Sequence, residues 1–309
     1  MTEPSATVIA GAIRPFELTR RQIGWTLSAH FLSSASIGVA IGGIVPLISV
    51  TLEAREVDTV IIGVNSAMTS IGVILAAPFV PSIVRALGAG WAIVSGLLFA
   101  TLATLGLGLV DELWVWLLLR LLMGVGVVTH WVVSETWMQE IVSERRRGLV
   151  MSVYVTSIAA GFASGPVVLS FTGTEGFLPF IVFATMIGLT ALPMIPIRHL
   201  VPPLALNERG SALRLMRQAP TIATAALAVG LVDAAFFTFL PLYGLRVGVP
   251  KEEALLLLTA VLGGNVLLQI PLGWLADKVS RRGLLIGLAA ICVAGPVVTA
   301  PFILSGSWI

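Results

Sequence analysis

The chain alternates long apolar runs with short loops that carry nearly all of its charges. A helix needs about 20 apolar residues to cross about 30 Å of hydrocarbon, and nine runs of this chain reach that length. They cover residues 23–50, 59–82, 89–110, 113–138, 149–171, 177–197, 220–242, 254–276 and 283–305. None shows the alternating segments of about ten residues that mark a membrane β-barrel. We therefore expect an all-α integral membrane protein with nine transmembrane helices.

Positive charges gather in alternate loops, and this asymmetry predicts the orientation of the helices. Fourteen of the 18 lysines and arginines lie on the side of the N-terminal tail, three lie on the opposite side (Arg55, Arg246 and Lys251) and Arg120 lies within a run. Because cytoplasmic loops retain Lys and Arg, the N-terminus is predicted to be cytoplasmic. The loops predicted to be outside are 53–58, 111–112, 172–176 and 243–253, and with nine helices the C-terminus falls outside as well.

Composition agrees with a lipid environment and excludes several function classes. The chain of 309 residues is 57% hydrophobic and 11% charged, against about 25% charge in a soluble domain. One cysteine, Cys292, and three histidines are too few for a disulfide scaffold or a zinc cluster. The net charge of +2 is spread over short loops and forms no basic stripe for nucleic acid. We expect a lipid bilayer as the surroundings, no nucleic-acid partner, no metal and no cofactor.

The polar stretch Arg198–Gln218 is the longest between two runs and divides the chain. It separates a six-helix bundle, residues 1–197, from a partial bundle of three helices, residues 219–309, with 198–218 as a cytoplasmic loop. The segments Pro81–Gly90 and Gly273–Arg282 close the second helix of each part and begin 192 residues apart. An internal repeat of this kind is typical of secondary transporters.

The loop after the eighth run resembles the loop motif G-x-L-x-D-[RK]-x-G-R-[RK] of the major facilitator superfamily. The matching residues are Gly273, Leu275, Asp277, Lys278, Arg281 and Arg282, while Ser280 stands at the second glycine. The first-half copy keeps Gly88 but has Pro81 and Arg85 at the first glycine and the aspartate. The resemblance implies two six-helix halves around a central cavity lined by helices one, four, seven and ten. It also implies that Asp277 and its basic neighbours gate the conformational change, and that this chain stops after helix nine.

Two helix motifs extend the resemblance along the chain. The fourth run carries R-x-x-x-G-x-G, the helix-four signature of the family, at Arg120, Gly124 and Gly126. The fifth run carries G-x-x-x-G-P at Gly161, Gly165 and Pro166, which resembles the motif of exporters that exchange substrate for protons. The alternative for these glycines is close packing between membrane helices.

Charged groups within apolar runs are costly in a bilayer and are candidates for function. Arg120 lies about 10 Å from the predicted outer face and Asp233 about 20 Å from the inner face of a core of about 30 Å, at about 1.5 Å per residue. They are predicted to lie at one level and to form a proton-coupling centre in the substrate cavity. A purely structural pair, or two charges that reach the interfaces separately, is the alternative.

Glu135 and His130 are further candidates for proton transfer. Glu135 lies near Trp137 at the predicted inner interface, where a solvated carboxylate is the alternative to a gating role. The ordinary pKa of an imidazole is near neutral, which would suit proton transfer by His130, but a lone histidine within a membrane helix more often forms a hydrogen bond between helices.

These features predict a secondary active transporter of a bacterial inner membrane. We expect it to work as a monomer by alternating access, to carry a small molecule coupled to protons, and to act as an exporter of the antiporter type. One alternative is a partial or inactive fragment of such a transporter. Another is an intramembrane enzyme, but Ser164 lacks the surrounding residues of a nucleophile elbow and the adjacent acidic pairs lie in loops.

Overall fold

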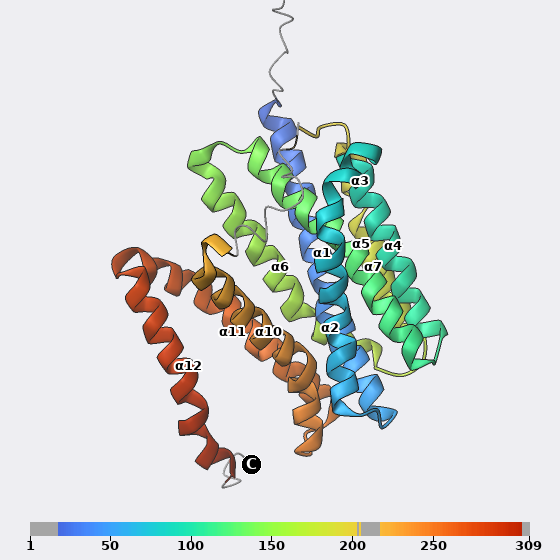
Figure 1. Cartoon of the computed structure of the whole chain (residues 1–309), viewed down its shortest axis with the longest axis vertical. Coiled ribbons are helices and arrows are strands. Elements are labelled where there is room, and N and C mark those ends of the chain that lie inside the picture. Colours follow the sequence, from blue (N-terminus) through green and yellow to red (C-terminus); the bar gives the residue numbers. More distant parts are fainter. Residues whose placement is uncertain (1–17, 203, 205–216, 305–309) are drawn as a thin grey trace, which may run out of the picture. The chain divides into compact units, whose positions relative to one another are not determined.

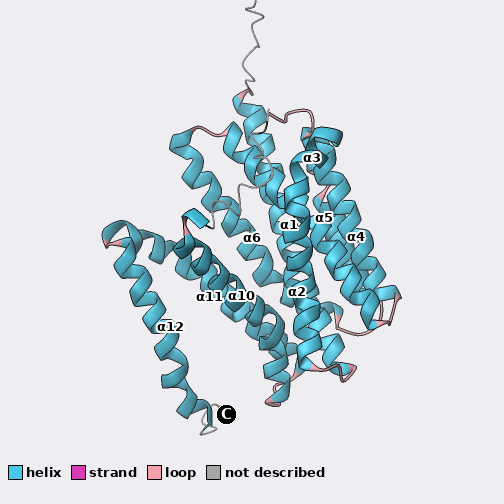
Figure 2. Cartoon of the chain, viewed as in Figure 1, coloured by secondary structure: helices cyan, strands magenta, loops and turns pink. Residues whose placement is uncertain are grey.

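The computed structural model describes residues 18–202, 204 and 217–304, and these residues form helices joined by short loops. The described part contains no strand (Figure 2). The chain divides into two compact units, the first within Met1–Thr259 and the second within Ala260–Ile309. The predicted cytoplasmic loop 198–218 falls largely outside the described residues, so the predicted division of the chain there stays a prediction.

Helices occupy all nine predicted ranges (Figure 1). They are α1 (Arg20–Ala54), α2 (Thr59–Ala76), the 3₁₀ turn η1 (Ala77–Phe79), α3 (Val80–Leu87), α4 (Ala89–Leu109), α5 (Leu113–Ile141), α6 (Glu144–Thr172), α7 (Leu178–Thr190), α8 (Met194–Ile197), α10 (Pro220–Arg246), α11 (Lys251–Lys278) and α12 (Arg281–Leu304). Seven helical stretches of the described chain are long and apolar enough to cross a membrane, the last of them Ala223–Arg246. The chain is thus an all-α membrane protein, while the count of nine spans stays a prediction.

Local polar contacts fix the starts of the first two long helices. The Thr19 hydroxyl accepts from the backbone N–H of Gln22, and the Gln22 side chain accepts from the backbone N–H of Thr19, which makes a capping box at the start of α1. Asp58 caps α2 by accepting from the N–H of Val60 at 2.8 Å. Between α3 and α4 the chain turns at Gly88 with φ +78°, a conformation that favours glycine.

Glycines allow α1 and α6 to approach until their backbones touch. These two helices make the most extensive contact between elements of the chain. A Cβ atom added at Gly161 would meet the carbonyl oxygen of Ala35, and one added at Gly165 would meet the backbone of Gly42. The G-x-x-x-G face of α6 therefore packs directly on α1, as expected for a small-residue contact between membrane helices.

The glycines of the helix-four motif hold α5 against two further helices. A Cβ atom at Gly124 would meet the carbonyl oxygen of Thr69 on α2, and one at Gly126 would meet Gly96 on α4. Because α5 lies so close to α2, the residue one turn before Gly124 on α5 lies against the α2 backbone. Arg120 occupies that position.

Candidate functional site

A cavity of about 160 Å³ lies within the first unit, between α1, α2, α5, α6 and α10. Most of its wall is apolar, with Trp131, Phe162 and Phe237 as the largest side chains. Its polar wall consists of Ser66, Thr69, Ser70, Arg120 and Thr238. A mostly apolar cavity with a few polar groups is the usual form of a small-molecule site.

Arg120 is the charged residue of this wall, and it is almost wholly buried, with 1% of its surface exposed. Its Nε donates to the carbonyl oxygen of Asn65 at 3.4 Å and its Nη2 to that of Ser66 at 3.5 Å. Both bonds are long, so they are weak. Nη1 has no hydrogen-bond partner. Within the part of the chain that the structure describes, no carboxylate forms an ion pair with Arg120.

Two neutral polar residues of α2 beside Arg120 also lack partners. Both side-chain atoms of Asn65 and the hydroxyl of Thr69 are buried and form no hydrogen bond. Buried polar groups are nearly always hydrogen-bonded, and a cluster of unpaired ones needs an explanation. Neither residue was predicted from the sequence, because neutral polar residues are common in membrane helices and the sequence does not show which of them lie near Arg120.

Asp233 lies on α10 next to Ala234, which lines the cavity, but Asp233 itself is exposed. In this structure it does not pair with Arg120. Two contacts between residues that line the cavity join α10 to α2 and to α6. The Thr238 hydroxyl donates to Ser66 Oγ at 2.9 Å, and Phe237 packs edge-on against Phe162 with ring centroids 5.4 Å apart.

His130 is fully buried in a hydrogen-bond chain that joins three helices. Its Nε2 lies 2.8 Å from Ser33 Oγ on α1 and its Nδ1 lies 3.3 Å from Ser134 Oγ. Ser33 Oγ donates to the carbonyl oxygen of Thr190 on α7 at 3.1 Å. Because a hydroxyl has one hydrogen to donate, Ser33 accepts from Nε2–H, and Nδ1 then accepts from Ser134. His130 thus joins α5 to α1 through hydrogen bonds, and its predicted role in proton transfer stays a prediction.

A second buried histidine, His30, was not among the residues predicted from the sequence. His30 on α1 packs edge-on against Trp137 with ring centroids 4.9 Å apart, and neither ring nitrogen has a partner. Positions 26, 30, 33 and 34 are all polar and buried, and their helical spacing puts them on one face of α1. This helical spacing of polar residues could have predicted from the sequence that His30 lies on a polar face of α1.

Glu135 is exposed and accepts from the side chain of Gln139 at 3.3 Å. Glu135 does not line the cavity that contains Arg120. No group of three His, Cys, Asp or Glu residues is placed to hold a metal ion within the residues described.

The loop with the family motif joins α11 to α12 in the second unit. Gly273 and Asp277 belong to α11 and Arg281 begins α12, but the structure does not describe the side chains of Asp277 and Arg281, while Lys278 and Arg282 are exposed. Ser280, at the position of the motif's second glycine, accepts from the backbone N–H of Gly283 at 3.2 Å. The departure from the motif therefore gives α12 an N-terminal cap. The gating role of Asp277 stays a prediction.

All three cations of the predicted outer loops form ion pairs. Arg246 on α10 binds Glu53 on α1 through two hydrogen bonds, of 2.8 and 3.0 Å, and also donates to Thr59 Oγ1 at 2.8 Å. Lys251 at the start of α11 lies 3.5 Å from Glu175 in the α6–α7 loop. We call Glu53–Arg246 and Glu175–Lys251 the outer ion pairs. The distribution of these charges along the sequence predicted the topology, but it did not predict which of them form pairs.

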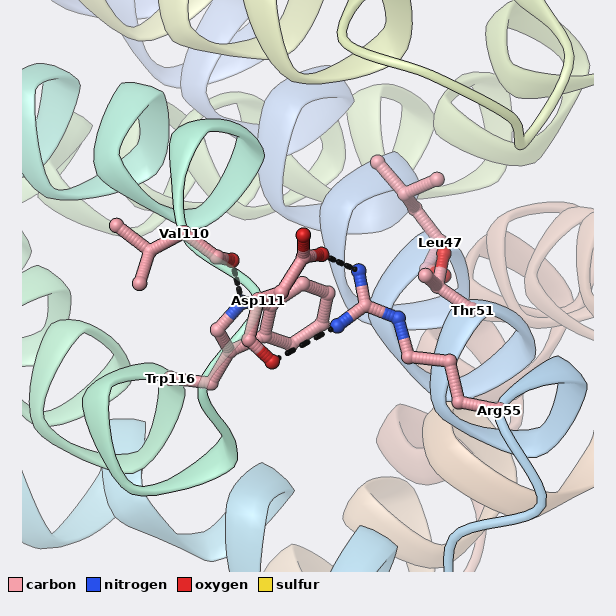
Figure 3. Close-up of polar contacts among 6 residues, drawn as sticks. All are labelled: Leu47, Thr51, Arg55, Val110, Asp111 and Trp116. Carbon is pink, nitrogen blue, oxygen red and sulfur yellow. Dashed lines mark hydrogen bonds and ion pairs between the residues drawn. The ribbon is translucent and has the colours of Figure 1, made fainter.

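The third pair, Arg55–Asp111, lies within the first six helices (Figure 3). Arg55 donates to the Asp111 carboxylate at 2.7 Å and to its carbonyl oxygen at 3.1 Å. The guanidinium also lies 4.7 Å from the ring centre of Trp116, whose Nε1 donates to the carbonyl oxygen of Val110. This pair connects the end of α1 to the α4–α5 loop without involving α10.

Comparisons with known proteins identify one family. The model of the Major Facilitator Superfamily matches residues 8–309. The uncharacterized MFS-type transporter YfkF of Bacillus subtilis is 30% identical over 280 residues, which cover 87% of this chain and 71% of that protein. The uncharacterized MFS-type transporter YcaD of Escherichia coli is 29% identical over 181 residues, which cover 57% of this chain and 47% of that protein. This chain thus matches about half the length of YcaD.

Two solved structures share the fold. A bacterial homologue of the human lysosomal transporter Spinster, in an inward-facing and unoccupied conformation, matches 86% of this chain and 64% of its own length, with a TM-score of 0.69. A D-xylose–proton symporter matches 84% of this chain and 70% of its own length, with a TM-score of 0.58. Both are 16% identical to this chain, so they show the fold alone.

Proposed function

Because this chain belongs to the major facilitator superfamily, we propose that it carries a small solute across a membrane by alternating access. The family makes it a multi-pass membrane protein and a transporter rather than an enzyme. The proposed location is a bacterial inner membrane, with the N-terminus in the cytoplasm and the protein acting as a monomer.

The observation that carries the proposal is the cavity between α1, α2, α5, α6 and α10. It combines hydroxyls and one guanidinium with aromatic walls, and the helices that line it are of membrane-spanning length. Transporters bind their substrates in such cavities near the middle of the bilayer.

The outer ion pairs support a state that is closed on the predicted outer side. They connect α1 and the α6–α7 loop to α10 and α11, and both lie at the predicted outer end. The similar Spinster homologue was solved in an inward-facing conformation, which agrees with closure at this end. In alternating access these pairs would break when the cavity opens outward.

We further propose that the transport cycle is coupled to protons through Asp233. Asp233 neighbours the cavity wall, and its proton affinity depends on the distance to a guanidinium such as that of Arg120. A conformational change that moves α10 relative to α5 would change that distance. The related fold of a D-xylose–proton symporter is compatible with such coupling. The motif at Gly161, Gly165 and Pro166 favours export, although its glycines also serve to pack α6 on α1.

Transport by the purified protein in proteoliposomes tests the proposal. A panel of radiolabelled solutes is offered with and without an imposed pH gradient. We expect at least one solute to accumulate only when the gradient is present, and to accumulate against its own concentration gradient. Accumulation that is insensitive to the pH gradient and to protonophores would argue against proton coupling, and absence of transport for every solute would argue against the proposed function.

A further inference from the structure

The cavity contains a buried cation and no carboxylate. Arg120 lines it, and none of its other lining residues is Asp or Glu. Asp233, the carboxylate nearest to the wall in the sequence of α10, is exposed and unpaired with Arg120. A buried charge without a partner of opposite sign is strongly unfavourable, so the guanidinium is expected to meet an anion from outside the chain.

Several hydrogen-bond donors of the residues that line the cavity have no acceptor within the described chain. Nη1 of Arg120 and the hydroxyl of Thr69 have no partner. Ser66 accepts from Thr238, so the hydrogen of its own hydroxyl remains available. All three residues line the cavity. A guanidinium flanked by hydroxyls matches the oxygens of a carboxylate or a phosphate.

The rest of the wall is apolar and aromatic. Trp131, Phe162 and Phe237 contribute the large surfaces, with aliphatic side chains between them. An inorganic anion would leave these surfaces without contact. An organic anion would place its charged group on the polar wall and its apolar body against the aromatic rings.

We propose that the cavity binds a small organic anion whose carboxylate or phosphate group is held by Arg120, Ser66 and Thr69. This proposal rests on the proposed transport function and names the substrate class. Arg120 then supplies the positive charge that balances the substrate within the bilayer. Thr69 and Ser66 orient the anionic group toward the guanidinium.

Binding is measured by thermal stabilisation of the detergent-purified chain with four related probes. Benzoate and phenyl phosphate carry the proposed groups, benzyl alcohol is neutral and benzylamine is cationic. We expect one or both anions to stabilise the protein at millimolar concentrations, while the other two probes do not. The stronger of the two anions distinguishes carboxylate from phosphate.

Variants connect the binding to the cavity. Arg120→Gln is expected to weaken binding of the anionic probe more than ten-fold, and Thr69→Val several-fold. Arg146→Gln removes an exposed arginine outside the cavity and should leave binding unchanged. Thr69→Val preserves side-chain volume, so it tests the site even if Arg120→Gln does not fold.

Three results would overturn the proposal. The first is that neither anion stabilises the protein, and the second is that Arg120→Gln and Arg146→Gln lose binding equally. The third is that binding appears only in Asp233→Asn, which would identify Asp233 as the partner of Arg120. Failure of the transport function can be distinguished from failure of the anion site. Anion binding by a protein that transports nothing would support the anion site and reject the transport function. Gradient-driven transport of neutral or cationic solutes alone, without anion binding, would keep the transport function and reject the anion site.

Discussion

Glu53 and Arg246 lie 193 residues apart in the sequence and form an ion pair with two hydrogen bonds, of 2.8 and 3.0 Å. The pair connects the end of α1 to the end of α10. Thr59, at the start of α2, accepts a further hydrogen bond from the same guanidinium at 2.8 Å. One arginine of α10 thus holds the ends of two helices of the preceding bundle together, at the predicted outer end.

Breaking this pair should favour opening at the outer end. Exposed ion pairs are weak, so Glu53→Gln should shift the equilibrium between the two states by no more than about five-fold. The measurement is labelling of Ser66→Cys in the cavity by a membrane-impermeant thiol reagent added outside, with Cys292 replaced by serine. We expect faster labelling in Glu53→Gln.

Asp111→Asn is the matched control for that experiment. It breaks the Arg55–Asp111 pair, which also lies at the predicted outer end but does not involve α10 (Figure 3). Labelling of Ser66→Cys should be unchanged in this variant. Equal acceleration by the two substitutions would mean that general loosening of the loops, and not release of α10, exposes the cavity.

The predicted orientation has a direct test by cysteine labelling. Glu252 and Arg145 are both exposed and lie at opposite ends of the predicted topology. In a Cys292→Ser background, Glu252→Cys should react with an impermeant reagent added to intact cells, and Arg145→Cys should react only after lysis. The reverse pattern would contradict the orientation based on the distribution of Lys and Arg.

Asp233→Asn should abolish accumulation driven by a pH gradient and preserve exchange of substrate across the membrane. Exchange needs no net proton movement, so a carrier that has lost only its proton site can still perform it. Both activities are measured with the same proteoliposomes. Glu112→Gln, which removes an exposed carboxylate outside the cavity, is the control and should retain both. Normal accumulation by Asp233→Asn would leave Asp233 without a coupling role.

The contact between α1 and α6 predicts unequal effects for two glycines of the same helix. A Cβ at Gly165 would meet the backbone of Gly42, whereas nothing lies within 4 Å of a Cβ at Gly148. Gly165→Ala should lower the free energy of unfolding by about 1–3 kcal/mol, the usual cost of overpacking. Gly148→Ala should be neutral or stabilising by up to about 1 kcal/mol. Reversible unfolding in mixed micelles measures both, and equal effects would contradict the close approach.

The hydrogen-bond chain of His130 predicts that Ser33 matters for stability. Ser33→Ala leaves a buried imidazole N–H and a carbonyl oxygen unpaired, at a cost of about 1–3 kcal/mol. Ser157→Ala is the control, because the Ser157 hydroxyl is exposed and bonds only within its own helix. The same unfolding measurement applies. A loss no larger than that of Ser157→Ala would show that the chain contributes little.

The helices were predictable from the sequence because membrane-spanning segments require length and hydropathy, and both are local properties. The helical ranges follow the apolar runs closely. One detail was not predicted: the second run is divided into α2, η1 and α3 at Ala77–Phe79, where Pro78 and Pro81 interrupt regular hydrogen bonding. The side chains that carry the family's loop motif lie partly outside the described residues, so their role remains a proposal.

The site was only partly predictable, for a physical reason. Arg120 was identified because a charge in an apolar run is costly wherever it faces. Asn65 and Thr69 are neutral, and their importance depends on lying beside Arg120, which is a property of the α2–α5 contact. The pairing of Glu53 with Arg246 depends on the approach of α1 and α10, which no local pattern encodes.

The hydroxyl of Ser66 serves two purposes at once. It belongs to the cavity wall, and it accepts the hydrogen bond by which Thr238 holds α10. A ligand that binds Ser66, as proposed above, would share this hydroxyl with the contact that holds α10, so its binding would be coupled to the position of α10. Linkage is reciprocal: a ligand that binds more tightly when α10 is docked must strengthen that docking by the same factor. In the proposed transport cycle, one serine hydroxyl would thus couple substrate binding to the helix whose movement opens the cavity.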